Sequence, residues 1–242
     1  MKREKKEIES YYNDYAEVQI KTGINQRHHS ILRLLRQSGL RRYHRVLEVG
    51  CGIGALTYLL ARYLSPRSEL VAIDISPKSV EIAQQRLRNY PNCRVFAGEA
   101  EDILPSPLTF DVIVLPDVLE HIPLEQHKHL FMVLRSLLTT DGFIFIHIPH
   151  PNFLRWSEQH LPDTLQLIDQ PVYTDKILSN AYPAGFYLHH LNSYGLWRQP
   201  YDYQVIVLKV VRDSDTFTLF GKTWMSRALD KLNRLIKEYI WL

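Results

Sequence analysis

The chain of 242 residues contains little cysteine and no long hydrophobic run. Its two cysteines, Cys51 and Cys93, are too few for a disulfide framework and have no metal-ligand spacing, so we expect reduced thiols and a cytosolic location. No run of about 18 apolar residues occurs, and residues 1–9 lack the apolar segment of a signal peptide. These absences argue against a membrane span and against secretion.

A large excess of charge of one sign is also missing. The 29 basic and 26 acidic residues give a formal net charge of +3. A protein built around nucleic-acid phosphates usually carries a stronger positive field, so the sequence has no strong nucleic-acid signal. With 45% hydrophobic residues the chain can bury one sizeable core, which favours a single α/β domain over two domains.

The strongest local pattern is a change from strand to helix through three glycines at residues 46–57. Residues 45–49 have the β-branched and apolar character of a central strand, and leucines recur at helical spacing after residue 55. Gly50 and Gly52 can take backbone angles closed to other residues and leave no Cβ between the chain and a ligand. Because the next helix begins with unpaired N–H groups, this turn predicts a cradle for a nucleotide-like cofactor.

Glu48 separates two interpretations of these glycines. Gly50, Gly52 and Ala55 also satisfy the G-x-G-x-x-G/A fingerprint of dinucleotide-binding proteins. In a dehydrogenase the positions before the first glycine are normally apolar, since a buried ionised carboxylate is costly. A carboxylate is reasonable there if a cation binds nearby, and S-adenosylmethionine carries a sulfonium and an ammonium. An NAD-dependent dehydrogenase remains the alternative enzyme class.

A second acid ends the next buried strand. Residues 70–74 are apolar up to Asp74, which lies twenty residues beyond Gly54. This is the distance at which the second strand of a βαβ unit returns beside the first. Asp74 can therefore accept hydrogen bonds from both ribose hydroxyls of an adenosine.

Together these stretches resemble the class I S-adenosylmethionine-dependent methyltransferases, in the branch of small-molecule O-methyltransferases. Residues 46–54 match motif I of that family, and residues 117–122, Asp-Val-Leu-Glu-His-Ile, match its signature after the fourth strand. The resemblance covers about residues 25–211. It implies an α/β fold with a Rossmann-like seven-stranded sheet of order 3-2-1-4-5-7-6, strand 7 antiparallel, and helices on both faces.

The resemblance also implies the cofactor contacts. Adenine is expected between Ile75 and the segment of Glu99 and Ala100, although Glu101 or Asp102 is an alternative to Glu99. A basic residue at the start of an early helix can reach the methionine carboxylate, which makes Arg27 the candidate. The residues expected to bind S-adenosyl-L-methionine are Arg27, Glu48, Gly50, Cys51, Gly52, Asp74, Ile75, Glu99, Ala100 and Leu115.

The rest of the chain is expected to complete one methyltransferase domain over residues 1–242. The tyrosines at positions 11, 12 and 15 fit a lid over the cofactor or packing on a neighbouring helix. The amphipathic C-terminal segment fits packing on its own domain or on a second subunit of a homodimer. The expected parts are an N-terminal helical lid (1–40), the cofactor-binding core (41–148), an acceptor-site insertion (149–173), the terminal strand pair (174–211) and a C-terminal helix (212–242).

Methyl transfer to a hydroxyl or a protonated amine requires a base. The candidates follow the fourth and fifth strands and are His121, His147 and His150, each with a hydrogen-bonding or capping role as the alternative. Aromatic residues of the insertion, Phe153, Trp156 and Tyr173, can close over an acceptor.

The acceptor class follows partly from missing motifs. The Asn/Asp-Pro-Pro-aromatic motif of nucleobase amine methylation is absent after the fourth strand, and the Asp-Asn pair of magnesium-dependent enzymes is absent after the fifth. We therefore expect no metal and predict methyl transfer to a small polar metabolite, on oxygen. A non-catalytic S-adenosylmethionine-binding scaffold is the non-enzyme alternative.

Overall fold

The structure is a computed structural model that describes residues 2–104 and 108–211. The predicted C-terminal helix, and the homodimer contact through it, lie outside the described residues. Within the described ranges, no helix is long and apolar enough to cross a membrane.

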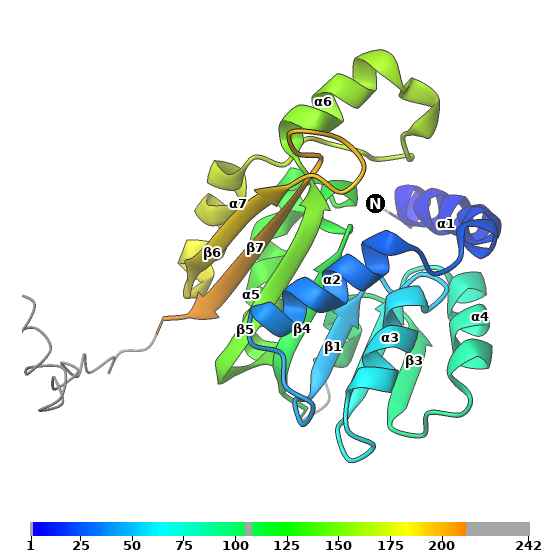
Figure 1. Cartoon of the computed structure of the whole chain (residues 1–242), viewed down its shortest axis with the longest axis vertical. Coiled ribbons are helices and arrows are strands. Elements are labelled where there is room, and N and C mark those ends of the chain that lie inside the picture. The colour runs from blue at the N-terminus through cyan, green and yellow to red at the C-terminus, as the bar shows by residue number, and fades with distance from the viewer. Residues whose placement is uncertain (1, 105–107, 212–242) are drawn as a thin grey trace, which may run out of the picture. The chain divides into compact units, whose positions relative to one another are not determined.

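Seven strands form one sheet in the order β3-β2-β1-β4-β5-β7-β6 (Figure 1). The pairs from β3 across to β5 are parallel, whereas β7 is antiparallel to both β5 and β6. The predicted strand order and the antiparallel strand are therefore confirmed. The strands are β1 (Val46–Val49), β2 (Leu70–Asp74), β3 (Cys93–Ala97), β4 (Phe110–Pro116), β5 (Leu138–Pro149), β6 (Phe186–Tyr194) and β7 (Tyr203–Val210).

Helices cover both faces of this sheet (Figure 1). Apolar residues of α2, α3 and α4 share one core cluster with the strands, and those of α5 and α7 share the other. The α-helices are α1 (Lys2–Thr22), α2 (Gln26–Gln37), α3 (Ala55–Tyr63), α4 (Pro77–Leu87), α5 (His127–Leu137), α6 (Pro151–His160) and α7 (Thr174–Ala181). Short 3-10 helices are η1 (Ala100–Ile103), η2 (Leu119–His121), η3 (Leu124–Gln126), η4 (Pro162–Thr164) and η5 (Tyr182–Ala184).

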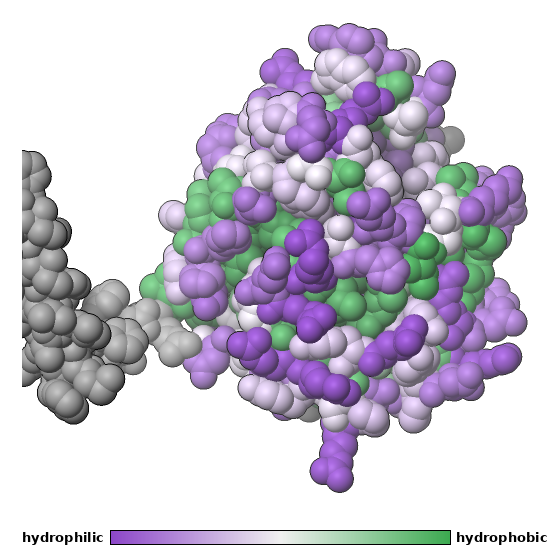
Figure 2. All heavy atoms as spheres, in the orientation of Figure 1, coloured by the Kyte–Doolittle hydropathy of each residue, from purple (hydrophilic) through white to green (hydrophobic). Residues whose placement is uncertain are grey.

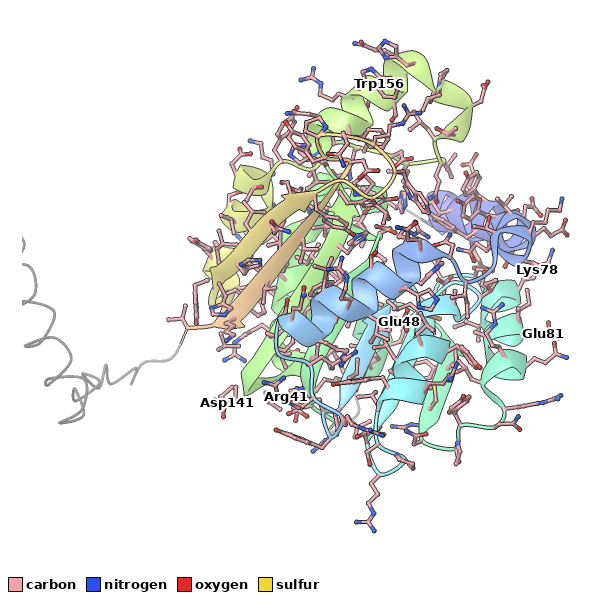
Figure 3. The ribbon with its side chains drawn as sticks, viewed as in Figure 1. Arg41, Glu48, Lys78, Glu81, Asp141 and Trp156 are labelled. Carbon is pink, nitrogen blue, oxygen red and sulfur yellow. The ribbon has the colours of Figure 1, made fainter. Side chains whose placement is uncertain are left out.

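Alternation along the central strands assigns each side chain to one layer. In β1, Val46 belongs to the cluster with α2, α3 and α4, whereas Leu47 and Val49 belong to the cluster with α5 and α7. Because successive side chains of a strand point to opposite faces, Glu48 points to the α2, α3 and α4 side. Figure 3 shows Glu48 in the middle of the molecule, among these elements.

The start of β5 is irregular. The Thr-Asp-Gly sequence at residues 140–142 is typical of a turn, but β5 already begins at Leu138. Leu138 pairs with Phe110, and the next pair joins Val112 to Phe143, so an irregularity absorbs the extra residues. Gly142 is required there, because a Cβ would lie 2.9 Å from the carbonyl oxygen of Asp111.

Helices α1 and α6 lie at the end of the sheet toward which β5 runs (Figure 1). Residues Arg41 and Asp141 mark the opposite end in Figure 3. Figure 2 shows hydrophilic residues over most of the viewed face, with smaller apolar areas between them. Ligands of open α/β sheets bind at the carboxyl ends of the strands, which makes the end with α1 and α6 the candidate site.

Candidate active site

The glycine turn is fixed to the neighbouring strand and to the loop after β4. The backbone N–H groups of Gly50 and Cys51 both donate to the Ile73 carbonyl, at 2.8 and 2.9 Å. Gly50 has a φ of 78°, and a Cβ on it would overlap the Val118 side chain. Glycine at this position therefore lets the loop after β4 pack directly against the turn.

Glu48 is a fully buried carboxylate beside this turn. Its side chain has no exposed surface, and no cation of the described residues pairs with it; the Thr57 side chain is the polar group that lowers its pKa. Burial raises the pKa of Glu48 to about 8. An ionised carboxylate in such a place needs a cation, so this orphaned group fits the positive sulfonium and ammonium of S-adenosylmethionine.

Asp74 is held at the end of β2 by two backbone donors. Its Oδ2 accepts from the Gly52 N–H at 2.7 Å, and its Oδ1 accepts from the Ser76 N–H at 2.9 Å. Burial raises the pKa of Asp74, and these two hydrogen bonds oppose that shift. Each oxygen of a carboxylate has a second lone pair, so Asp74 can still accept from two ribose hydroxyls.

The segment after β3 lies beside Asp74. The β2 and β3 register pairs Asp74 with Ala97, and the partly exposed Ile75 follows Asp74. Ala100 is buried at the start of η1. The two alternative acids have partners in the protein: Asp102 accepts from the backbone N–H of Glu99 at 2.8 Å, and Glu101 pairs with His129 at 3.3 Å.

Two other predicted cofactor residues are buried in the core. The Cys51 side chain is 6% exposed, and burial raises the pKa of its thiol. Leu115 has no exposed surface and lies one residue before the end of β4. Because both side chains are buried, a ligand can contact these residues only through their backbone.

Helix α1 crosses the glycine turn and the start of α4. The Gln19 Oε1 accepts from the Ile53 N–H at 3.2 Å, and its amide lies 2.7 Å from the place of a Cβ on Gly52. Farther along α1, the Asn13 Oδ1 accepts from the Ser76 hydroxyl at 2.7 Å and from the Lys78 N–H at 3.2 Å. Figure 3 shows Lys78 beside one end of α1. These polar contacts of Asn13 and Gln19 were not predicted.

Arg27 contacts a carboxylate of the chain itself. Its guanidinium lies 2.6 Å from Asp117, which follows β4 with a φ of 55°. Asp117 also contacts the His147 Nδ1 at 2.7 Å, and the His147 Nε2 contacts the Tyr194 hydroxyl at 2.8 Å. Although burial opposes it, the charges of Arg27 and His147 lower the pKa of Asp117 to about 2. Whether Arg27 also reaches the cofactor stays a prediction.

The three candidate histidines have different surroundings. His147 is fully buried, and both of its ring nitrogens have partners in the Asp117 network. His150 caps α6 by accepting from the Asn152 N–H at 3.2 Å, and burial lowers its pKa. His121 has an 11% exposed side chain and lies between two acids. That one of these histidines acts as the base stays a prediction.

His121 lies between Glu120 and Asp169. Its Nδ1 contacts the Ile168 carbonyl at 2.5 Å and lies 3.7 Å from Asp169, and its Nε2 lies 3.8 Å from Glu120. The Tyr12 ring of α1 approaches the imidazole with centroids 6.2 Å apart. The sequence motif contained Glu120, but no local pattern marked Asp169.

The insertion contributes to the site through its last residues. Residues 166–170 include Ile168 and Asp169, which contact His121. The aromatic residues of α6 instead contact one another and the loop before β7. The rings of Trp156 and His160 stack with centroids 4.6 Å apart, and the Arg198 guanidinium lies 4.8 Å from the centroid of the Trp156 ring. Figure 3 shows Trp156 at the outer edge of the molecule. That these aromatics close over an acceptor stays a prediction.

No group of three or more metal-ligating residues was found within residues 2–104 and 108–211. A cavity of about 360 Å³ lies elsewhere, between the end of α2 and the β6 and β7 pair, and its lining residues include Gln37, His189 and Asn192. None of the predicted site residues lines that cavity.

Residues 46–142 match the family model described as a methyltransferase domain. The chain is 28% identical to (S)-coclaurine N-methyltransferase of Thalictrum flavum subsp. glaucum over 80% of this chain and 50% of that protein. It is 29% identical to malonyl-[acyl-carrier protein] O-methyltransferase of Halalkalibacterium halodurans over 50% of this chain and 44% of that protein. The chain thus spans about half the length of these curated relatives.

Solved structures share the fold. The magnesium protoporphyrin IX methyltransferase of Synechocystis PCC 6803, solved with bound SAH, has a TM-score of 0.67 and 19% identity, covering 86% of this chain and 100% of that chain. Residues 46–142 thus match a methyltransferase domain, and the strand order and glycine turn agree with the fold of class I S-adenosylmethionine-dependent methyltransferases. The cofactor of this class is S-adenosylmethionine. The family match and the antiparallel strand β7 favour a methyltransferase over an NAD-dependent dehydrogenase.

Proposed function

We propose that this domain transfers the methyl group of S-adenosylmethionine to a small polar acceptor that binds beside Glu120 and His121. The contact between Gly50 and Val118 carries this proposal. It brings the glycine turn, which fits the cofactor, against the loop that presents Glu120 and His121. Donor and acceptor can then approach each other at one end of the sheet.

Three residues support the placement of the cofactor across the ends of β1, β2 and β3. Glu48 is fully buried and has no cationic partner among the described residues, which suits the cationic part of the cofactor. Asp74 keeps two lone pairs for the ribose hydroxyls, and Ala100 lies one strand farther, where the adenine is expected. The cofactor, when bound, supplies a methyl group activated by positive sulfur.

The residues of the chain then hold the acceptor and remove its proton. His121 contacts the Ile168 carbonyl through Nδ1, and only an N–H can donate to a carbonyl. The neutral imidazole therefore has its lone pair on Nε2, on the side of Glu120. Orientation of the acceptor against the methyl group supplies most of the rate, and proton removal by this pair supplies the rest.

The acceptor is a small metabolite in this proposal, and the sequence favours an oxygen atom. The name of the malonyl-[acyl-carrier protein] O-methyltransferase relative supports oxygen, whereas that of the coclaurine enzyme supports nitrogen. A binding scaffold without activity would share the cofactor residues, so turnover itself has to be measured.

The cofactor placement is tested with Asp74→Ala. Loss of a partly shielded double acceptor is expected to weaken binding of S-adenosylhomocysteine about thirtyfold, or roughly 2 kcal/mol, in calorimetry. Asp111→Ala is the matched control, because Asp111 also accepts from a backbone N–H, that of Arg45, but at the start of β4. Unchanged binding by Asp74→Ala would contradict the placement.

Methyl transfer is tested with cofactor labelled in its methyl group and a panel of small amines, phenols and carboxylic acids. We expect label in a small molecule, less with Asp74→Ala, and unchanged transfer with Asp111→Ala. Transfer to RNA or protein alone would contradict a metabolite acceptor. Tight binding of S-adenosylhomocysteine without any transfer would support the scaffold alternative.

A further inference from the structure

We propose that the acceptor carries an amine, which binds as an ammonium between the Glu120 carboxylate and the Nε2 atom of His121. This inference rests on the proposed methyl transfer and names its acceptor class. It replaces the oxygen acceptor that the sequence favours. The argument uses the hydrogen-bond donors, the burial and the charges around these two residues.

In the neutral tautomer of His121 given above, two hydrogen-bond acceptors face each other here. The Glu120 Oε1 and the His121 Nε2 lie 3.8 Å apart, beyond hydrogen-bond distance. Each atom can still lie about 2.9 Å from one shared nitrogen, because that distance is larger than half of their separation. An ammonium has several N–H groups and can donate to both atoms at once, whereas a hydroxyl has a single hydrogen.

Glu120 is also deeply buried, and one of its carboxylate oxygens is unsatisfied. Its side chain is 2% exposed, and its Oε2 has no hydrogen bond to any described residue. Buried carboxylates are normally paired with a charge or satisfied by donors. Its backbone is fixed as well, because its carbonyl accepts from the Gln170 N–H at 3.1 Å. The Glu120 carboxylate therefore has a fixed position and an oxygen that can accept a hydrogen bond from a ligand.

The surrounding charges favour a cation. Asp169 lies 3.7 Å from the other ring nitrogen of His121, and no lysine or arginine of the described ranges forms an ion pair with Glu120 or Asp169. The charge of Arg27 acts on Glu120, but Arg27 is paired with Asp117. Burial, and then the charges of Asp117 and Asp169, raise the pKa of Glu120. A bound cation would relieve this excess of negative charge.

The cofactor does not supply this cation. S-adenosylmethionine carries a sulfonium, an ammonium and a carboxylate, which together give one net positive charge. Glu48, on β1 beside the glycine turn, is a separate buried carboxylate that can balance that charge. The negative charge of Glu120 and Asp169 is then left for the acceptor.

The Tyr12 ring supports the same ligand class. It comes from α1, with its centroid 6.2 Å from that of the His121 ring. An aromatic ring near a carboxylate stabilises an ammonium through its π face, or packs against an aromatic ring that the amine carries. Tyr12 thus places an aromatic ring next to the pair of Glu120 and His121.

The proposed step is balanced in atoms and electrons. The ammonium first loses one proton to Glu120, and the freed nitrogen lone pair then forms the new N–C bond to the methyl group. The electrons of the broken C–S bond stay on sulfur, which leaves neutral sulfur in S-adenosylhomocysteine. The methylated nitrogen is again positively charged and leaves as an ammonium, and Glu120 then gives its proton to water.

The test uses the full chain saturated with S-adenosylhomocysteine and three probes that share one ring: benzylammonium, benzyl alcohol and benzoate. We expect calorimetry to show benzylammonium binding at least about tenfold more tightly than benzyl alcohol, with benzoate weakest. Glu120→Gln keeps the size of the side chain and should remove the preference. Glu81→Gln, on the exposed face of α4, is the matched control and should keep it.

The outcomes separate the two proposals. Failure of the wild-type chain to bind S-adenosylhomocysteine would overturn the proposed function. If S-adenosylhomocysteine binds but the three probes bind equally, or benzylammonium does not bind, the amine inference alone is wrong. Asp169→Asn is a second variant in case Glu120→Gln does not fold, and it should lower the preference by a smaller factor. An unchanged preference in both variants would also overturn the inference.

Discussion

At the scale of single residues, two buried acids near the site have opposite electrostatic situations. Asp117 has a guanidinium and an imidazole against it, and its pKa falls to about 2. Glu48 has no such partner, and burial raises its pKa to about 8. The first acid is satisfied by the protein, whereas the second requires either a proton or an external cation.

This difference predicts a pH dependence of stability that belongs to Glu48. Between pH values of about 5 and 8 the folded chain keeps a proton on Glu48 that the unfolded chain releases, so stability falls as the pH rises. The fall is at most about 1.4 kcal/mol per pH unit. Glu48→Gln has no such proton to release. In urea titrations, the free energy of unfolding of the variant relative to that of wild type should therefore increase as the pH rises through this range.

The same titration can be followed through the cofactor. Binding of S-adenosylhomocysteine brings an ammonium and should release up to one proton near pH 7, seen as a buffer-dependent heat in calorimetry. Glu48→Gln should show no such release. Parallel stability curves for the two proteins, together with equal proton release, would mean that Glu48 is ionised in the free protein.

The residues that could be predicted from sequence are those whose role depends on local pattern. Gly50 and Asp74 follow buried strands, so their place at one end of the sheet follows from strand order alone. Asp169 and Asn13 could not be predicted, because their roles arise only when distant segments meet His121 and Ser76. His147 shows the same limit: its position after a strand was visible, but its pairing with Asp117 and Tyr194 was not.

At the scale of elements, α1 is the part of the chain that most directly controls the glycine turn. Gln19 lies over Gly52, and Asn13 is bonded to the first turn of α4. A cofactor that occupies the turn must share this space with α1. We therefore keep the proposal that α1 acts as a lid.

Asn13→Ala tests how firmly α1 is held. The change removes the acceptor for the Ser76 hydroxyl and the Lys78 N–H, which is expected to weaken docking by about 1–2 kcal/mol, or roughly five- to thirtyfold. Alanine favours helix, so α1 itself is not weakened. Hydrogen exchange of α1 should accelerate, and S-adenosylhomocysteine should dissociate faster.

The exposed neighbour Asp14 supplies the control for this experiment. Asp14→Ala changes the same helix without touching α4 and should leave both rates near those of wild type. If Asn13→Ala speeds hydrogen exchange of α1 but leaves dissociation of S-adenosylhomocysteine unchanged, α1 is not a lid and its tyrosines serve packing.

Helices and strands could be predicted from the sequence where one local pattern was strong. The central strands were predicted because buried parallel strands are nearly continuous apolar runs. The start of β5 was not, because its pairing with Phe110 depends on an irregularity that no propensity indicates. The insertion was predicted as a segment but not as the helix α6, since its prolines and aromatics also fit a loop.

At the scale of the whole molecule, the site is assembled at one end of the sheet from segments far apart in the chain. The glycine turn, the Glu120 and His121 loop, α1 and residues 166–170 all meet there. All of them lie before residue 212, within the compact unit of residues 1–211. The family match covers residues 46–142 only, so the elements that contact His121 from α1 and the insertion lie outside it. The family match therefore covers the glycine turn, Asp74 and His121, but not the segments that contact His121 from α1 and residues 166–170.

A chain shortened to residues 1–211 tests whether this unit is self-sufficient. Because the described site residues and both core clusters lie within it, we expect cooperative thermal unfolding and binding of S-adenosylhomocysteine within about twofold of the full chain. Light scattering on both proteins tests the predicted homodimer at the same time: a dimer through residues 212–242 would be lost in the shortened chain. If the shortened chain fails to fold or loses cofactor binding, residues 212–242 are part of the domain. If both proteins have the same oligomeric state, those residues are not the dimer contact.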